Sequence, residues 1–270
     1  MKKSILTAVF LLSASVSHAL AADLSAPTYT KAPVLAAPAY NWSGVYAGLH
    51  GGYGWGRSPT TVTPDPTDAN RIVDPTGFTY APTPDTTRIA GAFGGGQIGY
   101  NFVQSNLLAG IEADISYAGW RSSGTAAGPA FIGGIFNTAV QTKLDWDGTL
   151  RGRLGWLATP SLLVYGTAGL AYGSVKTTVT GTNLGGASCD GSHVYCFSGS
   201  TGGVSLGWTA GAGVEIAAGQ DWSVKAEYLH IDLGSRSITV ADNFIGGGFE
   251  TIRNTFSADS VQAGVNYHIH

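Results

Sequence analysis

The segment DWDGTLRGRLGW, residues 145–156, decides the fold class because two kinds of side chain alternate along it. The even-numbered positions carry an apolar set that begins and ends with tryptophan: Trp146, Gly148, Leu150, Gly152, Leu154 and Trp156. The other parity is mostly charged or polar: Asp145, Asp147, Thr149, Arg151, Arg153 and Gly155. Because successive side chains of a β-strand point to opposite faces, this two-residue period predicts a strand between two different environments.

The same alternation recurs in residues 107–117, 208–216 and 261–269. In each segment, small aliphatic and aromatic side chains share one parity and polar residues occupy the other. The charged residues of the chain concentrate on these strand faces, whereas a soluble domain normally carries many Lys and Glu on its outer faces and loops. The sequence therefore predicts several strands with one apolar face and one charged face.

The composition narrows the class of protein. Only 11% of the 270 residues are charged, whereas soluble domains carry about 25%. The most apolar segment, LLVYGTAGLAY at residues 162–172, is interrupted by glycine and is shorter than the roughly 20 residues of a helical membrane span. Two options remain: a soluble β-sandwich or surface fibre, and a closed barrel in an outer membrane.

The spacing of Trp146 and Trp156 favours the membrane barrel. Ten residues separate them, which is roughly 25 Å at a strand tilt of about 40°, the height of the lipid-facing band of such barrels. We therefore expect the apolar parity to face lipid and the charged parity to line the lumen. The expected interface aromatics are Tyr117, Trp146, Trp156, Trp208 and Tyr267. The expected lumen charge network is Glu112, Asp114, Asp145, Asp147, Arg151, Arg153, Glu215, Lys225 and Glu227.

The connections between the predicted strands alternate between short and long. The strands are expected at residues 42–55, 88–103, 107–117, 140–157, 162–179, 203–217, 222–238 and 254–269. This rhythm predicts an all-β fold: an eight-stranded antiparallel transmembrane β-barrel with short periplasmic turns and long extracellular loops. The segment FIGGIF, residues 131–136, leaves ten strands open as an alternative.

The first 41 residues precede the expected barrel domain, residues 42–270. Residues 1–21 are typical of a signal peptide, in which Lys2 and Lys3 precede an apolar run and Ala19-Leu20-Ala21 forms a cleavage site. Residues 22–41 are rich in Ala and Pro and are expected to form an extended periplasmic leader. Cleavage after Ala21 leaves 12 basic and 17 acidic residues, net −5, so nucleic acid is not an expected partner.

Gly94, Gly96 and Gly99 match the spacing G-x-G-x-x-G, which can hold a dinucleotide at the start of a helix. No helical pattern follows, and the nearest later acids, Glu112 and Asp114, come too early after Gly99 and lie inside another alternating segment. In a narrow barrel, glycines on the wall make room for large inward neighbours. We therefore attribute the glycines to packing, and no cofactor is expected.

Two cysteines, Cys189 and Cys196, fall in the third long loop. An oxidising compartment and an even count favour a disulfide between them. With His193 they would supply too few ligands for a zinc site, so no metal is expected. No catalytic residues are expected either, because His230 and Asp232 alternate on one strand without an assignable nucleophile.

Several segments resemble the small outer-membrane immunogenic proteins of alpha-proteobacteria, usually labelled porin-family or outer-membrane β-barrel domain proteins. The matching pieces follow one another along the whole chain: WSGVYAGLHGGYGWG (42–56), GGGQIGYNF (94–102), GIEADISY (110–117), LRGRLGW (150–156), VYGTAGLAYG (164–173), VKAEYLHIDLG (224–234) and VQAGVNYHI (261–269). The resemblance implies an eight-stranded barrel in the outer membrane. Such barrels usually end in an aromatic residue, whereas this chain has Ile269 followed by His270, so assembly is expected to depend more on Tyr267.

Together these features predict a structural and antigenic outer-membrane protein that contributes to envelope integrity. Its lumen is expected to be filled, because eight strands leave an interior just wide enough for side chains. The alternative is a small passive pore for ions or small solutes. The expected partners are outer-membrane lipid and lipopolysaccharide, the barrel-assembly machinery during insertion and, through the leader, peptidoglycan.

Overall fold

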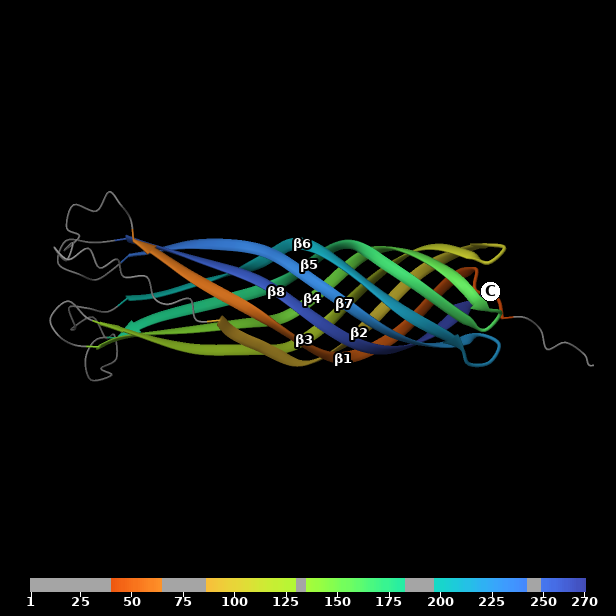
Figure 1. Ribbon diagram of the computed structural model, residues 1–270, viewed down its shortest axis with the longest axis horizontal. Coiled ribbons are helices and arrows are strands. Elements are labelled where there is room, and N and C mark those ends of the chain that lie inside the picture. Colours follow the sequence, from red (N-terminus) through yellow and green to blue (C-terminus); the bar gives the residue numbers. More distant parts are fainter. Residues whose placement is uncertain (1–39, 65–85, 130–134, 183–196, 242–248) are drawn as a thin grey trace, which may run out of the picture. The chain divides into compact units, whose positions relative to one another are not determined.

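The computed structural model describes residues 40–64, 86–129, 135–182, 197–241 and 249–270. They form eight strands: β1 (Gly44–Pro64), β2 (Thr86–Gln104), β3 (Leu107–Pro129), β4 (Ile135–Thr159), β5 (Leu162–Thr182), β6 (Phe197–Ala217), β7 (Trp222–Ala241) and β8 (Phe249–Ile269). Each strand pairs antiparallel with the next, and β1 also pairs with β8, so the sheet closes into a barrel (Figure 1). The predicted eight-stranded antiparallel barrel is confirmed.

The described residues contain no helix with the length and apolar character needed to traverse a bilayer.

Three short connections, residues 105–106, 160–161 and 218–221, lie at one end of the barrel, which we call the turn end. Towards the opposite end, several strands are longer than predicted: β1 extends to Pro64 and β3 to Pro129. Beyond the apolar band both parities carry Thr, Ser and Gly, so no hydropathy alternation marks these residues as strand. Gly128 pairs with Phe136 across β3 and β4, so the described residues of this segment continue β3 and β4.

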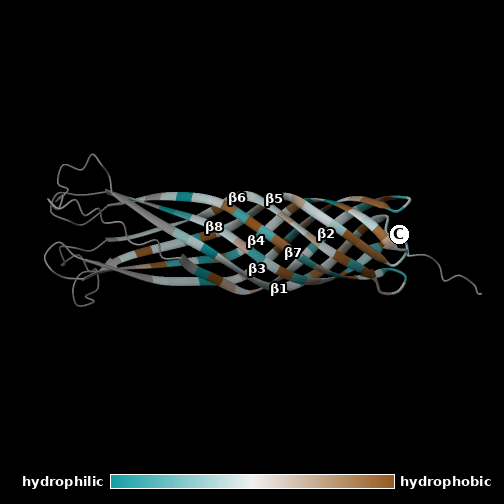
Figure 2. Ribbon diagram, viewed as in Figure 1, coloured by the Kyte–Doolittle hydropathy of each residue, from teal (hydrophilic) through white to brown (hydrophobic). Residues whose placement is uncertain are grey.

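Exposure alternates along the strands as the sequence predicts. On β8, Val261 and Val265 are exposed, whereas Gln262 and Asn266 are buried in the lumen. Many exposed side chains of the wall are large and apolar, and hydrophobic residues gather in the half of the barrel nearer the turn end (Figure 2). A wall that is apolar outside and polar inside is the reverse of a soluble domain.

One predicted lumen residue faces the other way. The pairing of β4 with β5 shifts register between Leu144 and Asp147. Leu144 and Asp147 are both buried although three positions separate them, and Asp145 is exposed. The expectation that Asp145 lines the lumen is therefore wrong, because a β-bulge reverses the parity on its two sides. Trp146, within the bulge, is half-buried and its ring packs 6.2 Å from that of Tyr172.

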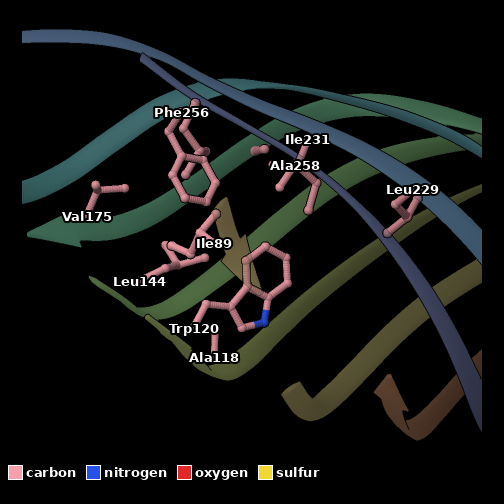
Figure 3. Packing of buried hydrophobic residues seen from close by; sticks show 11 residues of the cluster. Ile89, Ala118, Trp120, Leu144, Val175, Leu229, Ile231, Phe256 and Ala258 are labelled. Carbon is pink, nitrogen blue, oxygen red and sulfur yellow. The ribbon is translucent and has the colours of Figure 1, made fainter. Parts of the chain in front are cut away.

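The lumen is filled by layers of different chemistry. Away from the turn end, an apolar plug consists of Ile89, Ala118, Trp120, Leu144, Ala171, Val175, Leu229, Ile231, Leu233, Phe256 and Ala258. Figure 3 shows its side chains converging from several strands, with the Trp120 and Phe256 rings stacked 6.4 Å apart. At the turn end, a second apolar layer contains Trp42, Leu108, Leu163 and Tyr165. The charged residues described below occupy the remaining part of the lumen.

Glycines admit the largest lumen side chains. A Cβ atom on Gly54 would lie 1.9 Å from the Trp120 ring, and one on Gly99 would lie 2.3 Å from the Tyr46 hydroxyl. Real Cβ atoms do not approach so closely, so a larger residue at either position would displace the aromatic ring. Gly99, part of the G-x-G-x-x-G match, thus lies in β2 and makes room for Tyr46.

Candidate functional site

Glu112, on β3, is the centre of a buried ionic cluster in the lumen. Its Oε1 accepts a hydrogen bond from Arg151 Nη2 at 2.5 Å and another from Lys225 Nζ at 3.0 Å. Its Oε2 accepts one from the Tyr46 hydroxyl at 2.7 Å. Arg151 faces Glu112 directly on the neighbouring strand β4, whereas Lys225 reaches it from β7 across the lumen. All four side chains are shielded from solvent.

Arg153 connects the cluster to the turn end. Its Nη2 donates to Glu215 Oε2 at 2.6 Å, and its Nη1 donates to the Tyr46 hydroxyl oxygen at 2.6 Å. The guanidinium carbon lies 4.1 Å from the centre of the Tyr165 ring. A planar guanidinium can hydrogen-bond at its edge while its face stacks on an aromatic ring. Arg153 is therefore held on both its edge and its face.

The remaining carboxylates of the cluster are also engaged. Arg151 bonds to Glu227 at 2.9 Å and to Asp114 at 3.1 Å. Gln262 donates to Glu227 at 2.6 Å, and Thr149 donates to Asp114. Because isolated charges cannot be buried without a large desolvation cost, these contacts stabilise one another as a set. Eight of the nine residues of the expected lumen network are buried inside, and Asp145 is not.

Asp147 is buried outside this set of contacts. It lines a small cavity together with Asp114, Phe93 and Trp120. The cavity volume is about 10 Å³, which accommodates about one water molecule. Within the described residues, no group of three or more His, Cys, Asp or Glu is arranged to hold a metal ion. The cluster is thus built to neutralise charge in a packed interior.

A short segment before β1 covers the turn end of the lumen. Trp42 is 2% exposed and donates its indole N–H to the Pro160 carbonyl at 3.0 Å. The Tyr40 ring packs at 4.7 Å against Trp42, and partial burial raises the pKa of the Tyr40 hydroxyl to about 12. Desolvation disfavours the charged phenolate, and the carboxylates of Glu215 and Asp221 act in the same direction.

The predicted interface aromatics lie on the outer wall. Tyr117, Trp156, Trp208 and Tyr267 are exposed. Trp222 and Tyr267 pack at 5.0 Å near the turn end, and Tyr117 pairs with Trp146 towards the other end. Cys189 and Cys196 lie outside the described residues, so their disulfide stays a prediction.

Sequence reasoning missed Tyr46, Tyr165 and the apolar plug. Their parity could have revealed them: Trp120 lies eight residues after Glu112 on β3 and therefore faces the same side. Aromatic residues occur on both faces of these strands, so the aromatic residues that face the lumen could not be distinguished by type from those that face lipid. The apolar plug that contains Trp120 has no alternation of charged residues that would have predicted its position in the lumen.

A closed barrel with an apolar outer band, aromatic residues at both edges of that band and a buried ionic interior defines the class of outer-membrane β-barrel proteins. A family model described as "Outer membrane protein beta-barrel domain" matches residues 7–268, and the chain belongs to that family. Because of this membership and the relatives below, we place the protein in the outer membrane, with the turn end on the periplasmic side.

The relatives carry related descriptions. The "31 kDa outer-membrane immunogenic protein" of Brucella melitensis biotype 1 is 36% identical over 264 residues, covering 97% of this chain and 96% of the relative. The "25 kDa outer-membrane immunogenic protein" of Brucella abortus biovar 1 is 26% identical, covering 99% and 98%. Among solved structures, the outer membrane protein OprG of Pseudomonas aeruginosa is 14% identical, with a TM-score of 0.49 and coverage of 84% and 97%.

Proposed function

We propose that this protein is a structural and antigenic component of the outer membrane: a sealed barrel that contributes to envelope integrity and displays its extracellular loops. The observation that carries the proposal is the filled lumen. Apolar layers lie on both sides of the ionic cluster, and the cavity beside Asp147 has room for about one water molecule. A lumen packed in this way favours a mechanical role over transport.

The same packing argues against an enzyme. The carboxylates around Arg151, Arg153 and Lys225 accept hydrogen bonds from cations or amides, so they are occupied by structural partners. The antigenic part of the proposal is supported by the relatives, which are described as immunogenic. Assembly by the barrel-assembly machinery and contact of the leader with peptidoglycan stay predictions.

Planar-bilayer recording on the purified, refolded mature protein tests the sealed lumen. We expect no stable, reproducible conductance steps. A matched variant, Trp120→Ala with Phe256→Ala, removes the two stacked rings of the plug and tests whether the assay detects an opened lumen. Reproducible openings of the unaltered protein would favour the passive pore instead.

The envelope role has its own measurement. A strain that lacks the protein should become more sensitive to detergent and recover when the protein is restored. It should recover equally with a variant such as Asp145→Asn, because Asp145 is exposed outside the ionic cluster. A deletion strain with unchanged detergent resistance would contradict the proposal.

A further inference from the structure

The described residues contain ten Lys and Arg side chains, and their distribution is uneven. Three of them, Arg151, Arg153 and Lys225, lie in the ionic cluster. The other seven all lie on the extracellular part of the strands, beyond the aromatic residues of the wall. Six of these are exposed, and the five on the consecutive strands β1 to β5 form what we call the basic belt: Arg57 (β1), Arg88 (β2), Arg121 (β3), Lys143 (β4) and Lys176 (β5).

The strand register places the belt cations beside one another. Arg57 pairs directly with Arg88. Arg121 pairs with Lys143, and Lys143 pairs with Lys176. Arg121 also pairs with Ala90, two residues from Arg88, so the two directly paired groups are diagonal neighbours. The row therefore continues across five strands.

Arg236 on β7 and Arg253 on β8 extend the basic character further around the barrel. Arg236 donates to the Val204 carbonyl of β6, and Arg253 donates to the Ser235 hydroxyl at 2.8 Å. None of the seven is ion-paired with a carboxylate within the part of the chain that the structure describes. Like charges directly opposite each other destabilise a sheet, so an anion bound beside the row would stabilise it.

The height of the belt identifies the anion. Arg57 lies two residues beyond Trp55 on β1, and Lys176 lies four residues beyond Tyr172 on β5. At the rise and tilt of barrel strands, these steps are roughly 5–10 Å above the aromatic edge of the apolar band. The headgroup layer of a bilayer occupies about 5–8 Å on each side of the hydrocarbon. The belt thus lies at the depth of the phosphate groups.

We propose that the basic belt binds the phosphate groups of lipopolysaccharide in the outer leaflet. Rows of Arg and Lys give charge-assisted hydrogen bonds to phosphate oxygens, and neighbouring strands let one phosphate bridge two cations. Lipid phosphates relieve the repulsion within the row, and the row in turn holds a shell of lipid around the barrel.

The test measures how much diphosphorylated lipid A stays bound to the folded full-length mature protein after detergent washing. The variant Arg121→Gln, Lys143→Gln, Lys176→Gln should bind on the order of 100-fold more weakly, because each cation beside an anionic membrane surface contributes about fivefold. Binding by the unaltered protein should fall as salt is raised. Dephosphorylated lipid A should bind as weakly to the unaltered protein as diphosphorylated lipid A binds to the variant.

Two matched variants complete the design. The next outward row on the same strands is Ser123, Gln141 and Thr178, and alanine at these positions should leave lipid A binding unchanged. The charge-preserving variant Arg121→Lys, Lys143→Arg, Lys176→Arg should retain it. Unboiled migration on gels establishes that each variant is folded.

Three results would overturn the proposal. In the first, the triple Gln variant retains lipid A as well as the unaltered protein. In the second, inorganic phosphate displaces lipid A at equal phosphate concentration, which would make the belt a site for the free ion. In the third, a soluble polyanion saturates the belt as tightly as lipid A, which would assign the belt to a soluble partner.

Discussion

Glu112 illustrates at the scale of one residue how a membrane barrel carries charge in its interior. Three cations converge on its carboxylate, and the Tyr46 hydroxyl also donates a hydrogen bond to it. The cost of burying these groups is offset only while every partner is present. Removal of the central charge takes away the one carboxylate that all three cations share.

Glu112→Gln tests this dependence with little change in volume. Arg151, Arg153 and Lys225 lose their common anion, so the free energy of unfolding should fall by about 3–5 kcal/mol. Urea unfolding in lipid vesicles, followed by tryptophan fluorescence, measures it. The control Asp145→Asn alters an exposed carboxylate and should stay within about 0.5 kcal/mol. Equal stability of the two variants would show that the cluster is not structural.

At the scale of the element, β2 is shaped by how closely its neighbours approach it. Gly95 and Gly99 face the lumen side, where added atoms would meet the backbone of β3 or the Tyr46 ring. Gly96 has only the Gly48 carbonyl nearby, at 3.8 Å. Gly96 and Gly99 lie three residues apart in β2, yet a side chain has space at Gly96 and collides with Tyr46 at Gly99.

Gly99→Ala and Gly96→Ala should change stability in opposite directions. The first overpacks the lumen and displaces Tyr46 from Glu112, which should cost about 1–3 kcal/mol. The second has space, and alanine restricts the unfolded chain, so it should be neutral or stabilise by up to about 1 kcal/mol. The urea midpoints of both variants in lipid vesicles provide the comparison. Equal losses would mean that β2 tolerates no side chain at all.

At the scale of the whole molecule, closure between β1 and β8 joins the two ends of the barrel domain. The pairing runs from Val45 with Ile269 to Pro64 with Glu250. Because the sheet closes, the wall has no free edge, and the backbone polar groups can pair within the hydrocarbon. The same closure fixes which strands face one another across the lumen.

Crosslinking tests the closure directly. Gly51 pairs with Ala263. A short bifunctional thiol-reactive linker should therefore join the cysteines of the double variant Gly51→Cys, Ala263→Cys. The native cysteines are removed by Cys189→Ser and Cys196→Ser. The product should keep its two ends joined after boiling and migrate differently from the unlinked chain. Val45→Cys with Ala263→Cys is the control, since Val45 pairs six residues away at Ile269. Equal linking of both pairs would contradict the register.

Periodicity and composition were sufficient to predict the barrel, the direction of each strand face and most of the lumen charges. Prediction failed at Asp145, where a bulge reverses the parity, and at the far strand ends, where Thr and Gly occupy both faces. It also missed Trp120, whose parity matched the lumen but whose chemistry matched the lipid-facing wall. In each case the local sequence pattern did not show which residues of the neighbouring strands contact that position.

The sequence by itself determined that apolar side chains face lipid while charges face inward, because a strand alternates faces whatever surrounds it. Only the tertiary structure decided which charges meet. Glu112 and Arg151 are neighbours through strand pairing, but Lys225 lies 113 residues from Glu112 along the chain and reaches it across the lumen. That contact depends on the stagger of all eight strands around the closed barrel, which no single segment encodes.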